Sequence, residues 1–260
     1  MKMSDELKKH YELSFKSSMF CWYPKIKDLD IPQPKTNVVP FTEYERREIY
    51  YLYYEDTPVS KPLEDKLFSN AKDIEYPLFM RTDQSSGKHG WNGTCFVNNE
   101  TVLMEHIKAL VEWHEMQMPL GMPFGGMIFR EYIEMAYKFK AFNGLPIPPE
   151  RRYFIKNKKI VDRTPYWPEE AIRFYPETNE YADTTWKQDL YKMNKETPEE
   201  VQLLSGYCEM VAEQFDEYWS IDFCKGKDGT WYLIDMARGE VSWNPKDDQQ
   251  KNKIALKDFI

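Results

Sequence analysis

Three acidic residues near the end of the chain have the types and spacing to bind a hard metal ion. Asp222 and Asp235 each lie in an apolar run, WSIDFC and WYLIDMA, and Glu240 follows a few residues later. A carboxylate among apolar neighbours is costly unless it is paired or binds a metal, and oxygen ligands without histidine or thiolate suit Mg²⁺ better than zinc. The sequence therefore predicts a Mg²⁺ site at these three residues. The alternative is that backbone groups or Arg238 satisfy the two aspartates.

A polar glycine loop earlier in the chain carries groups that bind phosphate. The segment SSGKHG offers backbone N–H groups, the hydroxyls of Ser85 and Ser86, and the ammonium of Lys88. The GxxxxGK[ST] spacing of a P-loop is missing, so an ordinary solvated turn is the alternative. Arg81, on the strand that enters the loop, adds a fixed cation if it points inward.

Two further arginines, Arg152 and Arg163, fall on strands that are predicted to pair. The runs RRYFIK and KIVDRT are joined by Asn157-Lys158, a tight turn that can use left-handed geometry at asparagine. Both guanidinium groups can then reach one anion. The alternative is a pair of exposed charges on a half-buried sheet.

The elements that must position these groups are a mixture of helices and strands. Prolines predict an extended stretch over 20–41, and the Thr-Pro-Glu-Glu run before 201 predicts a capped helix start. Helices are predicted over 2–18, from 43 onward, and over 102–113, 168–174, 184–193 and 198–216. Strands are predicted over 77–83, 91–97, 127–133, 151–156, 159–164, 218–224 and 230–236.

Composition limits the class of protein. With 260 residues and 42% hydrophobic content, the chain can form one large domain or two lobes that share a cleft. No apolar run approaches the roughly 20 residues that span a bilayer, and the charged start lacks a signal peptide core, so we expect a cytoplasmic protein without membrane contact. The scattered cysteines and histidines do not fit a structural zinc site. A net charge of −8 argues against broad binding to a phosphate backbone, but it does not exclude an RNA substrate.

Several motifs, taken in order, resemble the ATP-grasp superfamily, and most closely the family of the eukaryotic assembly chaperone for the translation initiation factor two complex. The resemblance covers about residues 22 to 241. It rests on these segments: Cys21-Trp22-Tyr23-Pro24, Pro34-Lys35-Thr36, Ser85-Ser86-Gly87-Lys88 with Trp91 and Thr94, Phe129-Arg130-Glu131-Tyr132-Ile133, Glu150-Arg151-Arg152-Tyr153-Phe154 with Arg163, and Asp222 followed by Ile234-Asp235 and Gly239-Glu240-Val241. The chain is similar in equal measure to a bacterial and phage ATP-grasp clade named for two arginines and a lysine.

The resemblance implies an α+β fold in which two α+β lobes with mainly antiparallel sheets clasp ATP and Mg²⁺. We expect an N-terminal extension over 1–72, a first lobe over 73–133 and a second lobe with the metal site over 134–260. Adenine would lie on the backbone from Glu131 to Ile133, with Glu134 near the ribose. The implied nucleotide contacts are Arg81, Ser85, Ser86, Lys88, Arg130, Glu131, Tyr132, Ile133 and Glu134, and the implied catalytic cations are Lys88, Arg152 and Arg163.

The first functional hypothesis is an ATP-dependent ligase with an unknown acceptor, either an RNA end or a carboxylate. The clade resemblance implies RNA repair as one such role. The alternatives are an ATP-controlled assembly chaperone for a protein complex and an ATP-binding interaction protein without catalysis. Two departures bear on this choice: Ala237 stands where relatives usually have a metal-binding asparagine, and Arg81 stands where many have lysine. Glu240 would then have to supply the missing oxygen.

Overall fold

The computed structural model describes residues 5–117, 123–172 and 185–246. Its elements, in chain order, are α1 (Asp5–Lys16), α2 (Met19–Ile26), β1 (Thr36–Pro40), α3 (Glu43–Glu55), α4 (Lys61–Ile74), β2 (Leu78–Thr82), η1 (Lys88–Gly93), β3 (Phe96–Val97), η2 (Glu100–Val102), α5 (Leu103–Gln117), β4 (Gly126–Glu131), β5 (Phe139–Ala141), β6 (Leu145–Ile147), β7 (Glu150–Lys156), β8 (Lys159–Pro165), α6 (Glu169–Ile172), α7 (Thr185–Met193), α8 (Pro198–Ala212), β9 (Trp219–Lys225), β10 (Trp231–Arg238) and η4 (Gly239–Val241). The η elements are short 3₁₀ helices.

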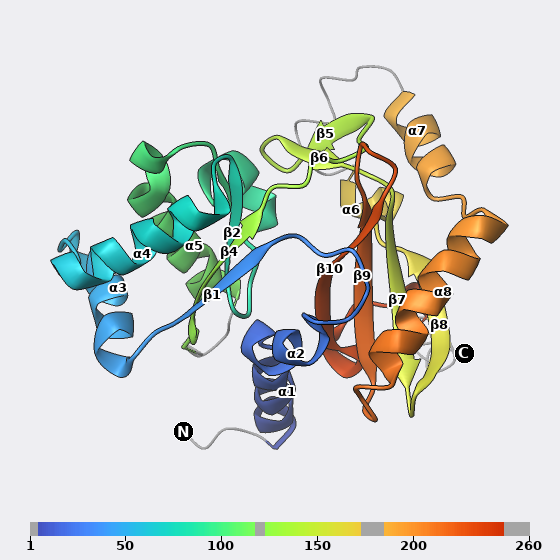
Figure 1. The fold of residues 1–260 in the computed structure, drawn as a ribbon, viewed down its shortest axis with the longest axis horizontal. Helices are drawn as coiled ribbons and strands as arrows, with labels where there is room; N and C mark the ends of the chain where they lie inside the picture. Colours follow the sequence, from blue (N-terminus) through green and yellow to red (C-terminus); the bar gives the residue numbers. More distant parts are fainter. Residues whose placement is uncertain (1–4, 118–122, 173–184, 247–260) are drawn as a thin grey trace, which may run out of the picture.

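The first lobe is an antiparallel sheet in the order β1-β4-β2-β3, with α3, α4 and α5 packed on one face (Figure 1). Side chains of β2 alternate between the two faces, as strand geometry requires. Leu78 and Met80 join the core under the helices, whereas Phe79 and Arg81 face the second lobe. The edge strand β1 comes from the stretch that was predicted to be an N-terminal extension.

The second lobe is an antiparallel sheet in the order β10-β9-β7-β8. Helix α8 packs on the face that carries Tyr153 and Ile221, and the other face points toward the first lobe. The predicted start of α8 is confirmed, because the Thr197 hydroxyl accepts from the Glu200 N–H at 3.2 Å and the Glu200 carboxylate accepts from the Thr197 N–H at 3.4 Å. The predicted α+β class, with two lobes and antiparallel sheets, is confirmed.

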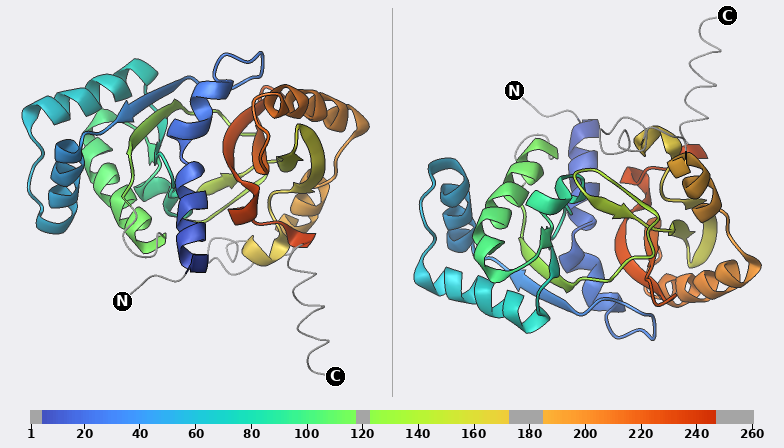
Figure 2. Two further views of the ribbon diagram at one scale, coloured as in Figure 1. Left: turned by 90° about the horizontal axis from the view of Figure 1, so that it is seen from below. Right: turned by 90° about the horizontal axis from the view of Figure 1, so that it is seen from above.

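The two N-terminal helices lie between the lobes (Figure 2). Ser17 Oγ of the segment after α1 accepts a hydrogen bond from the Arg238 N–H at 2.9 Å, and Ser18 Oγ donates to Asp83 at 2.5 Å. The prediction of an extended chain over 20–41 is wrong at its start, because α2 continues through Pro24. Burial of Trp22 within the core of the second lobe outweighs the backbone hydrogen bond that proline removes.

A small hairpin, β5–β6, joins the lobes on the side opposite α1 and α2 (Figure 1). Its turn contacts η1, because the Asn92 N–H donates to the Asn143 carbonyl at 3.3 Å and Asn143 Nδ2 donates to the Gly90 carbonyl at 3.4 Å. Trp91 and Leu145 belong to the apolar core that forms there. None of the described helices is long and apolar enough to cross a membrane.

Candidate nucleotide and metal site

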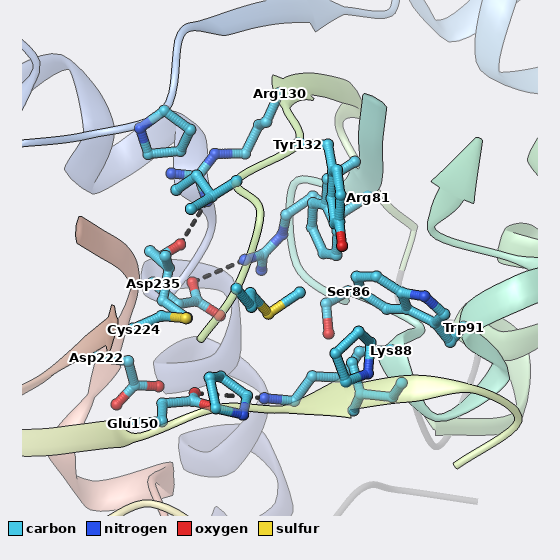
Figure 3. Close-up of a pocket in the computed structure, with 18 of the residues that line it drawn as sticks. Arg81, Ser86, Lys88, Trp91, Arg130, Tyr132, Glu150, Asp222, Cys224 and Asp235 are labelled. Atoms are coloured by element: carbon cyan, nitrogen blue, oxygen red, sulfur yellow. Dashed lines mark hydrogen bonds and ion pairs between the residues drawn. The ribbon is translucent and has the colours of Figure 1, made fainter. Parts of the chain in front are cut away.

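A cavity of about 750 Å³, counted together with its open mouth, lies between the two sheets (Figure 3). The first lobe lines it with β2, η1 and the end of β4, and the second lobe lines it with β7, β9 and β10. Phe79, Tyr132 and Met135 supply apolar surface, and charged groups from both lobes converge on the same space. A partly apolar cavity on which a few polar groups converge is typical of a small-molecule site.

An irregularity in β10 turns Asp235 into this cavity. In a regular strand Leu233 and Asp235 would share a face, but the pairing with β9 shifts between them, so that Asp235 lies directly across from Asp222. Leu233 and Met236 both face the core of the second lobe, and Ile234 and Asp235 both line the cavity. The β-bulge therefore places the two predicted metal ligands as cross-strand neighbours.

Arg130 holds the bulged segment from the other lobe. Its guanidinium donates to the carbonyl of Ile234, and its Nε donates to Thr36 Oγ1 at 3.2 Å. Only 3% of Arg130 is exposed, and burial together with the nearby Arg81 lowers the pKa of Arg130 to about 10. The structure thus places Arg130 in the cavity wall, where it contacts the strand that carries Asp235.

Both aspartates are already paired with arginines. Arg81 Nη1 lies 2.8 Å from Asp235 Oδ1 across the lobes. Arg152 donates from Nε and Nη2 to the two oxygens of Asp222, each at 2.8 Å. Burial alone would lower the pKa of Arg152, but Asp222 outweighs it and raises the pKa above its usual value. From the sequence, pairing of the two aspartates with Arg238 was the alternative to metal binding. In the structure they pair with Arg81 and Arg152 instead.

Lys88 and Glu150 form a third contact between the lobes (Figure 3). The ammonium lies 3.6 Å from Glu150 Oε1. Glu150 is only 3% exposed, and this burial is the main reason that its pKa rises to about 7, although Lys88 opposes the rise. Burial lowers the pKa of Lys88, but Glu150 and Tyr166 together raise it above its usual value. Burial thus raises the pKa of Glu150, and the carboxylate in turn favours the charged form of Lys88.

The glycine loop is held close to the helix behind it. Gly87 has a left-handed φ of 59°, and a Cβ there would lie 2.6 Å from Leu110 Cδ1, so only glycine fits without a shift. Ser86 and Lys88 line the cavity. Ser85 is not among the described residues that line the cavity. Its N–H instead donates to Thr82 Oγ1 at 2.8 Å and closes a turn.

The segment predicted to contact adenine follows β4. Glu131, Tyr132 and Ile133 line the cavity, between the end of β4 and the bridge that joins Met135 to Gly226. Glu134 is turned away from it: its carboxylate lies 2.6 Å from Lys227 Nζ, on an exposed part of the surface. The predicted contact of Glu134 with a ribose therefore does not fit this geometry.

Two other expected site residues also lie elsewhere. Arg163 pairs across the sheet with Tyr153, whereas Arg152 pairs with Thr164, so the two guanidinium groups leave opposite faces and cannot share an anion. Arg163 instead contacts Glu196 at 2.9 Å. Glu240 follows β10 in η4, where Arg238 binds its carboxylate at 3.0 Å, and it does not line the cavity among the described residues. The structure therefore does not bring Glu240 together with the two aspartates.

The cavity fits a Mg²⁺ ion that arrives with phosphate groups better than one held by protein alone. Within residues 5–117, 123–172 and 185–246, no group of at least three histidine, cysteine or acidic side chains is arranged to hold a metal. Asp222 and Asp235 supply hard oxygen atoms, and Mg²⁺ commonly takes one or two carboxylates and completes its shell with water and substrate phosphates. Arg81 and Lys88 line the same cavity, and their charge suits such phosphates.

Sequence reasoning assigned no role to some residues that line the cavity. Glu150 begins the Glu150–Phe154 segment that resembles the family motif. It stands two residues before Arg152 on the same strand, so both side chains lie on one face, and this spacing could have placed Glu150 beside Arg152. Trp167 lies 4.6 Å from Lys88, measured from the ring centroid to Nζ, and no pattern in the sequence connects these two residues. Leu145 and Pro146 come from the β5–β6 hairpin, whose Asn143-Gly144 turn signal was overlooked.

Comparison with known proteins gives a consistent picture. The sequence model of the family described as "ATP-grasp domain, R2K clade family 3" matches residues 70–255. The structure is similar to C-terminally truncated Cdc123 from Schizosaccharomyces pombe, with a TM-score of 0.53 and 15% identity, covering 88% of this chain and 85% of that one. A second structure of Cdc123 from the same organism gives a TM-score of 0.51 and 16% identity, covering 87% of this chain and 85% of that one. No curated protein sequence gives a significant match.

Proposed function

Because the chain belongs to the R2K clade of ATP-grasp domains, family 3, we propose that its interlobe cavity binds ATP with Mg²⁺ and serves an ATP-dependent ligase. One observation carries the proposal. The cavity brings Arg81 and Lys88 of the first lobe against Asp222 and Asp235 of the second, so that cations for phosphates and oxygens for Mg²⁺ meet in one space.

The adenine is assigned to the apolar part of the cavity. Phe79, Tyr132 and Met135 offer surface for a planar base, and the backbone of Tyr132 and Ile133 offers hydrogen-bonding groups beside it. The phosphates then extend toward Ser86 and Lys88. In this arrangement nucleotide binding uses residues from both lobes.

Mg²⁺ is assigned to Asp222 and Asp235, together with nucleotide phosphates and water. When bound, the ion neutralises charge on the phosphate groups. Arg81, now 2.8 Å from Asp235, can exchange part of that ion pair for a phosphate oxygen. Arg152 stays with Asp222 through its two bonds of 2.8 Å and fixes the direction in which that carboxylate points. We therefore assign Arg152 a positioning role.

Lys88 is the residue that we assign to the transferring group. Its ammonium lies at the cavity wall and retains its charge, because Glu150 and Tyr166 raise its pKa. Charge that grows on a phosphoryl or adenylyl group during transfer is stabilised by a fixed cation. The acceptor in this proposal is a carboxylate or an RNA end.

A second function, ATP-controlled assembly of a protein complex without turnover, is favoured by a different observation. Both candidate metal ligands are already paired with arginines at 2.8 Å, and Ala237 offers no side-chain oxygen near them. Such a site can bind nucleotide and change the affinity for a partner protein while transferring nothing.

Product analysis with labelled ATP separates the two functions. The protein is incubated with ATP and Mg²⁺, with and without a panel of RNA ends and carboxylate acceptors. A ligase forms ADP or AMP only with an acceptor, and Lys88→Met abolishes this product while Glu240→Gln does not. Tight binding of ATP without product for any acceptor would favour the assembly function, and absence of ATP binding would reject both.

A further inference from the structure

The environment of Lys88 differs from that of the other cations near the cavity. Its Nζ lies 4.0 Å from the ring centroid of Tyr166 and 4.6 Å from that of Trp167. Its ion pair with Glu150 spans 3.6 Å, which is longer than a hydrogen bond. Arg81 and Arg152, in contrast, contact their carboxylates at 2.8 Å, although the Arg152 guanidinium also lies 4.6 Å from the ring centroid of Tyr166. Aromatic ring faces, rather than a close carboxylate, thus surround the Lys88 ammonium.

The backbone that carries the two rings is held by hydrogen bonds of its own, and the rings contact each other with a centroid distance of 4.8 Å. The Tyr166 N–H donates to the Glu150 carbonyl at 3.1 Å, and the Trp167 carbonyl accepts from Asn194 at 2.9 Å. Trp167 is 3% exposed and packs against Phe142 with a centroid distance of 5.4 Å. The aromatic wall therefore belongs to the second lobe, and its packing continues through Phe142 to His89, which stacks on Phe142 with a centroid distance of 4.3 Å beside Lys88.

A ring face attracts an ammonium group without using its N–H donors in directed bonds. The ring faces can therefore hold the position of Nζ, and the donors that the Tyr166 hydroxyl does not engage remain available for an anion in the cavity. A close carboxylate would hold the ammonium as firmly, but it would compete with the anion for the same donors.

We propose that Tyr166 and Trp167 are positioning residues, which hold the Lys88 ammonium in place for a phosphate group of the bound nucleotide. The proposal rests on the nucleotide function assigned above. Its energetic basis is conformational entropy: a free lysine side chain must be ordered when phosphate binds, at a cost that corresponds to about two- to tenfold in affinity. The wall orders this side chain before the nucleotide arrives.

The test uses tripolyphosphate and ATP as probes, with binding measured by calorimetry on the full chain. Tyr166→Leu removes the ring and keeps apolar bulk, and Tyr166→Phe keeps the ring. We expect Tyr166→Leu to weaken the binding of both probes by about two- to tenfold, and Tyr166→Phe to restore it. Adenosine, which has no phosphate, should bind all three proteins equally.

A double-mutant cycle with Lys88→Met separates positioning from a general structural effect. In the Lys88→Met protein, Tyr166→Leu should cause little further loss of tripolyphosphate binding. The inference would be overturned if Tyr166→Leu weakened tripolyphosphate binding equally with and without Lys88→Met. It would also be overturned if Tyr166→Leu weakened adenosine binding, or if it left tripolyphosphate binding unchanged in the protein that retains Lys88. If the unmodified protein binds neither ATP nor tripolyphosphate, the proposed function falls as well, whereas binding that depends on Lys88 but not on Tyr166 removes the inference alone.

Discussion

Replacing Glu150 by glutamine should change how stability depends on pH. Burial raises the pKa of Glu150 from 4.5 to about 7 in the folded protein. The difference corresponds to about 3 kcal/mol, because each pH unit of pKa displacement corresponds to about 1.4 kcal/mol. With 3% of Glu150 exposed, little solvent screening reduces this figure.

The sign follows from proton binding. The folded protein holds the Glu150 proton more tightly than the unfolded chain does, so this carboxyl favours folding fully below pH 4.5 and loses that contribution as the pH rises through about 7. Glutamine does not titrate. The free energy of unfolding of the unmodified protein, minus that of Glu150→Gln, should therefore fall by about 3 kcal/mol between acidic and mildly alkaline pH.

The assay is urea unfolding of both proteins at several pH values between about 5 and 8, which covers the steep part of the expected curve. Titration of groups that do not interact with Glu150 largely cancels in the difference. Lys88 does not cancel, because Glu150 helps to raise its pKa against burial, so Lys88→Met is used as the common background for both proteins in a repeat of the titration. A flat difference would refute the reasoning, because it would show Glu150 ionised beside Lys88 throughout.

Three further predictions concern the proposed site residues and the expected ones that do not line the cavity. Asp235→Asn should raise the Mg²⁺ concentration needed for ATP binding, whereas Glu240→Gln should follow the unmodified protein throughout a Mg²⁺ titration; a matching shift in both would return Glu240 to the site. Arg152→Met should lower the free energy of unfolding by about 3–5 kcal/mol, since it leaves a buried carboxylate unpaired, and urea unfolding with a loss below 1 kcal/mol would contradict this pairing. Arg163→Met should leave ATP affinity unchanged in calorimetry, and a tenfold loss would show that it reaches the nucleotide.

Features set by neighbouring residues were predicted well. The turn at Asn157-Lys158 has φ values of 50° and 60°, as its hairpin pattern indicated, and the cap at Thr197 with Glu200 formed as its spacing implied. The ATP-grasp fold and the resemblance to the R2K clade, which rest on motifs in order along the chain, are confirmed by the family match over residues 70–255 and the likeness to Cdc123.

Features set by distant contacts were not predictable in the same way. Pro24 indicated an end to helical structure, but burial of Trp22 in a core formed by residues far along the chain keeps α2 helical. The bulge at Ile234 depends on the pairing of β10 with β9, and its carbonyl is bound by Arg130 from the other lobe. The order of the motifs suggested Glu240 as a metal ligand. Its ion pair with Arg238 could be seen only in the folded chain.

The central claim is that ATP and Mg²⁺ occupy the cavity between the lobes, and a crystal structure of the protein grown with both tests it most directly. The account predicts a purine beside the backbone of Tyr132 and Ile133, phosphates within hydrogen-bonding distance of Lys88, and a metal ion bound by Asp222 and Asp235. Nucleotide bound elsewhere on the protein, or an empty cavity in crystals at millimolar ATP and Mg²⁺, would contradict it.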